Sequence, residues 1–169
     1  MRPALEARCR AMGWATVEAN LRVVRAPIYE TEAGRAIVRG LPRDPEEQAE
    51  LYEALTNIRR VRARFQRAIG APRPDPQNAA IMVMPERFEA TDLDGARPEP
   101  LAPEEEARRA RAGYMNLTRW LGELAHHERA TLQAVAIDGE PCRKADLPTY
   151  IAALRHVHEH LTGKARAKA

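Results

Sequence analysis

The chain has 169 residues, enough for one ordinary domain or two very small ones. It is 44% hydrophobic and 30% charged, with a mean hydropathy of -0.54, which describes a core under a very polar surface. The net charge is +3 and the pI is near 9.1, so the balance favours contact with an acidic partner without requiring one. Aromatic residues make up only 5%, which suits packed helices better than a sandwich of aromatic strands.

The sequence carries no signal for export or for membrane insertion. No apolar run approaches the length of a membrane span, and residues 1–10 lack the apolar segment of a signal peptide. The two cysteines, Cys9 and Cys142, lie far apart and lack the spacing of a metal or redox motif. We therefore expect a cytoplasmic protein with reduced thiols and no membrane partner.

Residues 4–25 fit two interpretations. Their first half has apolar residues at helical spacing. Val17, Leu21 and Val23 instead fall on one side of an alternating pattern, which is typical of a strand, and a turn could lead from it into a second strand at 36–38. A short β-hairpin near the N-terminus therefore stays open beside a helical interpretation.

Residues 44–69 predict a long helix. Asp44 is a preferred N-cap, and Pro45 suits the first helical position. Gly70 and the prolines after it would end the helix. The apolar stripe expected to face the core consists of Leu51, Leu55, Ile58, Phe65 and Ile69.

The second half of this helix is strongly basic, with five arginines and no acid between residues 58 and 67. On a helical wheel, Arg60, Arg64 and Arg67 share an edge opposite the apolar stripe. Together with Arg59 they are candidates for contact with phosphate or an acidic partner, although a solvated helix end has the same pattern. Arg62 falls within the apolar stripe, which favours an interface.

Residues 71–102 are expected to be a connector, because they hold six of the thirteen prolines. Their apolar island, residues 81–84, is short enough for one strand or a tucked-in loop. A second helix is predicted over 103–124, with glutamates in its first turn. The domain organisation is then an N-terminal helical region at 1–70, the connector, a C-terminal helical module at 103–163 and a basic tail at 164–169.

The C-terminal module predicts a helix over 127–137, a turn at 138–141 and a last helix over 147–161. Three helices with a tight turn are typical of a helix-turn-helix, and a plain helical hairpin that caps a bundle is the alternative. Arg143, Lys144 and Arg155 are its candidate binding residues. The first turn of the last helix is poor in polar side chains, so contact with protein or phosphate is favoured over base reading.

The stretch His156-Val157-His158-Glu159-His160 satisfies H-x-x-E-H, the pattern of inverted zinc peptidases. His156 and His160 share one helical side, which we predict to face solvent, away from Leu154. A peptidase also needs a third ligand, and no acidic residue follows His160. We therefore interpret the match as coincidence at a helix end, and expect no metal and no cofactor.

A resemblance to sigma-region-4 modules is carried by the segment from Arg119 to Cys142. In such modules a leucine and an E-R-x-x-L helix precede the turn, and this pattern is matched by Leu121, Leu124, Glu128, Arg129, Leu132 and Val135. Similar modules occur in phage-derived regulators, including Q-type antiterminators and activators of gene transfer agents. The resemblance implies binding to RNA polymerase, to DNA, or to both.

The sequence thus predicts a mainly α protein, a small helical bundle with a C-terminal helix-turn-helix-like module. The function expected is that of a non-enzymatic transcription regulator or antiterminator that binds RNA polymerase or nucleic acid and takes no small-molecule substrate. Two other hypotheses stay open. One is an oligomeric assembly or packaging protein whose long helices bury Arg62 and Phe65 against copies of themselves. The other is a zinc-dependent hydrolase.

Overall fold

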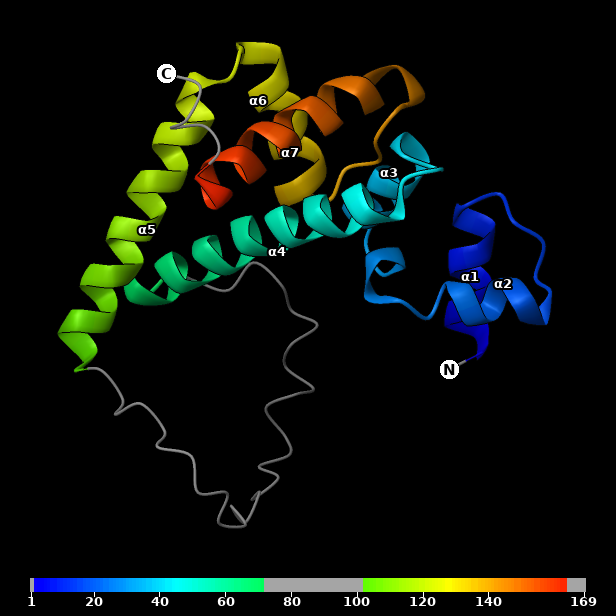
Figure 1. Cartoon of the computed structure of the whole chain (residues 1–169). Helices are drawn as coiled ribbons and strands as arrows, with labels where there is room; N and C mark the ends of the chain where they lie inside the picture. The colour runs from blue at the N-terminus through cyan, green and yellow to red at the C-terminus, as the bar shows by residue number, and fades with distance from the viewer. Residues whose placement is uncertain (1, 72–101, 164–169) are drawn as a thin grey trace, which may run out of the picture.

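The computed structural model describes residues 2–71 and 102–163, and every regular element in these ranges is helical (Figure 1). Short 3-10 turns occupy Pro27–Tyr29 and Lys144–Asp146, and a π-helical turn at Gln133–Ile137 continues α6. The mainly helical class is therefore confirmed. The α-helices are α1 (Arg2–Ala11), α2 (Glu18–Val23), α3 (Glu32–Gly40), α4 (Pro45–Ala68), α5 (Pro103–Glu123), α6 (His126–Leu132) and α7 (Leu147–Thr162).

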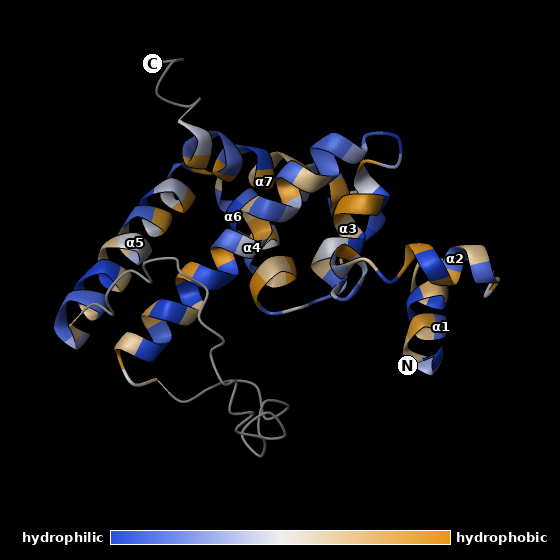
Figure 2. Ribbon diagram, turned by 60° about the horizontal axis from the view of Figure 1, so that its bottom comes forward, coloured by the Kyte–Doolittle hydropathy of each residue, from blue (hydrophilic) through white to orange (hydrophobic). Residues whose placement is uncertain are grey.

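Two predicted segments fall largely outside the described residues. They are the proline-rich connector at 71–102, with its apolar island at 81–84, and the basic tail at 164–169. Within the described ranges every helix is too short or too polar to cross a membrane. The helices carry hydrophobic and hydrophilic residues along the same ribbon, as expected for helices that bury one face (Figure 2).

The long helix α4 begins and ends where its local sequence predicts. The Asp44 carboxylate accepts a hydrogen bond from the Glu47 amide at 2.9 Å, and Pro45 occupies the first turn. Gly70 follows with a φ of 65°, a conformation that favours glycine. The stripe behaves differently along the helix: Leu51, Leu55 and Ile58 are fully buried, whereas Phe65 is half-buried and Ile69 is 50% exposed.

Of the two interpretations left open near the N-terminus, the β-hairpin is not found, because its two segments form α2 and α3. Leu21 and Val24 are buried, three residues apart, while Val17 and Val23 are 53% and 49% exposed. A strand would have placed Val17, Leu21 and Val23 on the same face, and the helix separates them. Helices α1 and α2 pack around Cys9 at the end of the molecule away from α5 (Figures 1 and 2), and α3 adds only Val38 to this cluster while its Ala36 and Ile37 belong to the main core.

The start of α3 depends on a cap and on a glycine. The Thr31 hydroxyl accepts a hydrogen bond from the Gly34 amide at 3.2 Å, which fixes the first turn. A Cβ at Gly34 would lie 1.9 Å from the carbonyl oxygen of Ile28. Only glycine therefore allows the 3-10 turn at Pro27–Tyr29 to pack this closely against α3.

Helix α7 lies at the centre of the main bundle and contacts α3, α4, α5 and α6. Figure 1 shows it running beside α4, in the same direction, and Arg155 pairs with Glu47 while His158 lies 3.6 Å from Glu50. Its buried residues are Tyr150, Ile151, Ala153, Leu154 and Val157. The Tyr150 hydroxyl donates to the Ala33 carbonyl at 3.2 Å, which joins α7 to α3 across the core.

The helix-turn-helix arrangement is not confirmed. Helix α6 and its π-helical turn cover the predicted 127–137 segment, and α7 covers the predicted last helix. The link between them runs through residues 138–146, however, and includes a 3-10 turn, whereas a helix-turn-helix has a turn of three or four residues. Asp146 lies at the N-cap position of α7, but its side chain makes no capping hydrogen bond.

Candidate functional site

The basic half of α4 presents its arginines in three directions. Arg60, Arg64 and Arg67 are exposed and follow one another at intervals of four and three residues, so they form one edge of the helix. Among the described residues, Arg67 donates a hydrogen bond only to the carbonyl of Ala63 in its own helix, at 3.4 Å. We call this row the basic edge. Of the five arginines predicted on α4, these three are exposed to a partner in the described part of the chain.

Arg59 points into the protein. Its Nε donates to the carbonyl of Ala136 at 3.0 Å, and one Nη donates to the hydroxyl of Thr31 at 3.2 Å. Ala136 belongs to the π-helical turn, and Thr31 caps α3. The guanidinium therefore ties three elements together, and we assign Arg59 to the fold instead of to the basic edge.

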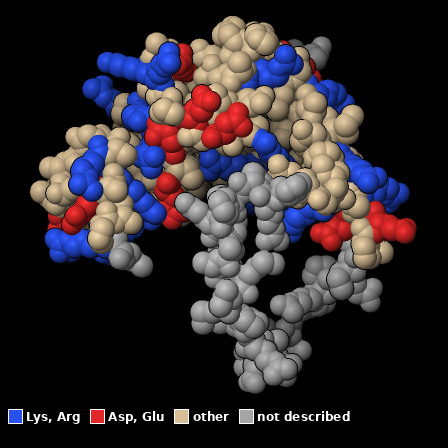
Figure 3. All heavy atoms as spheres, turned by 180° about the vertical axis from the view of Figure 1, so that it is seen from behind, with Lys and Arg blue, Asp and Glu red and all other residues tan. Residues whose placement is uncertain are grey.

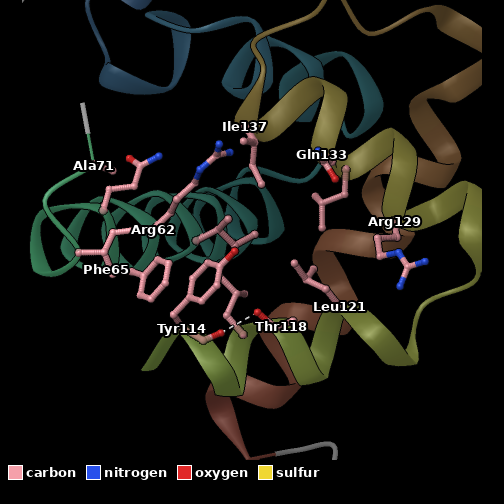
Figure 4. A pocket seen from close by; sticks show the side chains of 14 residues that line it. Arg62, Phe65, Ala71, Tyr114, Thr118, Leu121, Arg129, Gln133 and Ile137 are labelled. Atoms are coloured by element: carbon pink, nitrogen blue, oxygen red, sulfur yellow. Dashed lines mark hydrogen bonds between the residues drawn. The ribbon is translucent and has the colours of Figure 1, made fainter. Parts of the chain in front are cut away.

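Arg62 lines a pocket between α4, α5 and the π-helical turn (Figure 4). The pocket encloses about 410 Å³. Arg62 is half-buried and makes no hydrogen bond or ion pair with another described residue. Figure 4 shows it extending toward Ile137, while Arg129 directs its guanidinium away from the pocket. The lining also includes Ile58, Phe65, Ile69, Tyr114, Leu117, Leu121 and Leu132.

The wall of the pocket is set by an aromatic pair. Phe65 of α4 stacks on Tyr114 of α5 with ring centroids 4.0 Å apart and planes 5° apart. The two helices run antiparallel, because Val61 lies beside Gly113 while Ile58 and Leu117 line the pocket together further along. The sequence predicted the helix over 103–124 that carries Tyr114 and Leu117. It missed that α4 and α5 leave a pocket between them, since a stripe on one helix does not reveal how closely its partner approaches.

The candidate binding residues of the C-terminal module, Arg143, Lys144 and Arg155, do not belong to the basic edge. Arg143 and Lys144 are exposed in the link before α7. Arg155 pairs with Glu47, and this hydrogen bond raises the pKa of Arg155 above its ordinary value. Glu47 precedes Arg60 by thirteen residues, or about 20 Å of helix. On the face in Figure 3, basic side chains are likewise interspersed with acidic and neutral ones.

Little of α7 is exposed to solvent. Pro148, Ala152 and Arg155 are exposed on it, before its final residues, and most of the rest is buried or half-buried against neighbouring helices. A recognition helix must present a whole face to a groove of DNA. Burial of α7 at the centre of the bundle therefore leaves it unsuited to that role.

The histidines of the last helix are not solvated as predicted. The His160 ring stacks on Trp120 of α5 with centroids 5.4 Å apart, and its Nε2 lies 2.8 Å from a carboxylate oxygen of Glu123. His156 Nε2 lies 3.1 Å from the carbonyl oxygen of Trp120 and 3.6 Å from Glu123. The prediction failed because the side of α7 opposite Leu154 is covered by α5. A wheel drawn for one helix cannot include that neighbour.

Glu123 completes a group that the sequence pattern did not reveal. Its carboxylate and the side-chain nitrogens of His156 and His160 lie within 4.8 Å of one another, so this set could hold a metal ion. The prediction looked for a third ligand downstream of His160. The fold supplies one from upstream, at the end of α5, thirty-three residues before His156.

Comparison with protein-family models, with curated proteins and with solved structures finds no significant match to the chain. The resemblance to sigma-region-4 modules therefore stays a prediction, and a functional proposal depends on the surface described above.

Proposed function

We propose that this protein is a non-enzymatic regulator that acts by binding, and that its partner is an acidic, partly apolar surface of RNA polymerase. The observation that carries the proposal is that α4 presents the basic edge, Arg60, Arg64 and Arg67, on its exposed side and forms one wall of the apolar pocket with its opposite side. Aromatic residues and Arg are enriched in protein interfaces, and both occur here.

The apolar pocket, with Arg62 inside it, is suited to bind an amphipathic segment of the partner. A helix or extended stretch can place apolar side chains against Phe65, Ile69 and Tyr114, as in recognition of a helix by a groove. Arg62 lies inside this site without an acid beside it in the described part of the chain, so a carboxylate of the partner would complete it. The basic edge would then steer the acidic partner during encounter.

Contact with protein is favoured over sequence-specific contact with DNA. The helix expected to read bases, α7, is largely buried. The exposed cations of the C-terminal module, Arg143 and Lys144, lie outside α7 and can contact backbone phosphates without reading bases. A nucleic-acid contribution would therefore be electrostatic, and added salt would weaken it steeply.

The test is a double charge reversal. Arg60→Glu with Arg64→Glu should weaken binding to purified RNA polymerase from the source cells at least about 100-fold. The matched control is Arg10→Glu with Arg25→Glu, the same change in charge at two exposed sites of the N-terminal end. Circular dichroism melting checks that both variants stay folded.

Unchanged binding by the Arg60 and Arg64 variant would refute the assignment. Equal losses in both double variants would show that overall charge, and not the basic edge, decides the affinity. A polymerase that fails to bind the wild-type chain would remove the proposed partner.

An oligomeric assembly protein is a second candidate, supported by two exposed apolar side chains. Ile69 is 50% and Met115 is 67% exposed, on the two helices that form the pocket. The version predicted from sequence is less favoured, because Phe65 already stacks on Tyr114 of its own chain. Light scattering separates the two functions, since a ring or higher oligomer supports assembly and a monomer supports the regulator.

A further inference from the structure

The end of α5 and the last two turns of α7 form a cluster of metal-ligand side chains outside the proposed binding surface. Glu123 Oε2 lies 2.8 Å from His160 Nε2 and 3.6 Å from His156 Nε2. The histidine side chains are 16% and 27% exposed, and that of Glu123 is 46% exposed. The site is therefore enclosed on the protein side and open to ions from solvent.

The cluster has the right donors in a suitable arrangement. Two histidines four residues apart on a helix, with a carboxylate from a neighbouring element, are a common donor set for zinc. In a tetrahedral zinc site the ligand nitrogens lie about 3.3 Å apart. Here the three ligand atoms already lie within 4.8 Å of one another, so small side-chain rotations would bring them to that spacing.

Packing already orients the two rings. Trp120 stacks on His160 with planes 12° apart, and the rings of His156 and His160 meet edge to face with centroids 4.7 Å apart. The His156 Nε2 would exchange the Trp120 carbonyl oxygen for the ion, a contact of 3.1 Å that a rotation of the ring releases. Rings held in this way lose little freedom on binding, which favours affinity.

We propose that Glu123, His156 and His160 bind one Zn²⁺ ion, which fastens the end of α5 to α7. Three protein ligands leave a fourth position for water, on the side where Glu123 is exposed. His158 is not a ligand, because it lies on the opposite side of α7, 3.6 Å from Glu50 of α4. Because the ion binds only where the two helices meet, it stabilises the folded state.

This inference does not depend on the proposed partner. Glu123 is nine residues beyond Tyr114 on α5, or about 14 Å from the aromatic pair. Zinc binding and polymerase binding can therefore succeed or fail separately.

The experiment titrates Zn²⁺ into tag-free, chelator-treated full-length protein and follows it by isothermal calorimetry and thermal melting. The wild type should bind one Zn²⁺ per chain and melt at a higher temperature with the ion. Glu123→Gln and His160→Ala should each weaken binding at least about 100-fold, more than the loss typical of a second-shell change. Substitution with Co²⁺ should give the visible spectrum of a tetrahedral site.

His127→Ala is the matched control, because His127 is exposed on α6 and should leave zinc affinity unchanged. Glu123→Gln keeps the size and polarity of the side chain, so it tests the site even if His160→Ala fails to fold. Absence of binding by the wild type would overturn the proposal. Equal binding by wild type and Glu123→Gln, or a loss in His127→Ala as large as in Glu123→Gln, would also overturn it.

Discussion

Two adjacent arginines of α4 should differ sharply in what they do for stability. Arg59 donates to the buried Ala136 carbonyl at 3.0 Å and to the Thr31 hydroxyl at 3.2 Å, while Arg60 is exposed. Arg59→Ala removes two charge-assisted hydrogen bonds and leaves a buried carbonyl without this donor. For a half-buried side chain this should lower the free energy of unfolding by about 2–3 kcal/mol. Arg60→Ala should change it by less than about 0.5 kcal/mol.

Both variants keep a strong helix former at the position, so helix propensity cancels in the comparison. Urea denaturation gives the difference from the shift in midpoint at constant slope. In thermal melting, Arg59→Ala should lower the Tm by about 5–10 °C. Equal losses for the two variants would refute the internal assignment of Arg59. The result also decides which arginines can be reversed in binding experiments without unfolding the protein.

Two glycines and a tyrosine give further predictions. Gly34→Ala should lower the free energy of unfolding by at least about 3 kcal/mol, because the new Cβ would lie 1.9 Å from the Ile28 carbonyl oxygen. Gly122→Ala should raise the free energy of unfolding by about 0.5–1 kcal/mol, because a Cβ at Gly122 meets no atom within 4 Å and alanine favours the helix α5. Calorimetric melting checks both, and a neutral Gly34→Ala would contradict the close packing. Burial raises the pKa of Tyr150 far above 10.0, so the unfolded chain loses this proton first and stability falls as pH rises above 10. Between pH 9 and 11, the titration of Tyr150 should lower the free energy of unfolding by about 1.4 kcal/mol. Urea denaturation at several pH values should show that Tyr150→Phe lacks this decrease, and the same pH dependence in the variant and the wild type would contradict the prediction.

Local sequence was sufficient to predict α4, α5 and α7. The cap at Asp44, the proline at the start of each of α4 and α5, and the glycines at 70 and 163 act within one turn of the chain. Such signals do not depend on distant residues. Sequence therefore placed these helix ends within one or two residues.

The two interpretations of residues 4–25 stayed open because the segment is too short for its hydrophobic period to be decided. The six residues of α2 contain Leu21 and Val23, a pair that alternates as in a strand, whereas Leu21 and Val24 have helical spacing, so a stretch of so few residues does not decide the period. The deciding contacts are tertiary: Leu21 and Val24 meet Leu5 and Cys9 of α1. The N-cap Thr31 is a local signal that favours α3 over the hairpin turn that the sequence left open.

The candidate site was predictable in composition but not in arrangement. The five arginines of α4 were evident, yet their separation into an internal residue, a pocket residue and an exposed edge depends on α3, α5 and the π-helical turn. The same limit explains the histidines. Only the approach of α5 brings Glu123 beside His160, and no spacing within α7 contains that information.

The central place of α7 has a consequence for the order of folding. Tyr150 bonds to Ala33 across 117 positions of the chain, and Leu154 completes the core that Leu55 and Ile58 belong to. At a synthesis rate of about 5–20 residues per second, α7 is completed on the order of 5–20 s after α4. The part of α4 that packs on α7 therefore stays uncovered until α7 has been synthesised, and completion of the main bundle is a cooperative event that follows it.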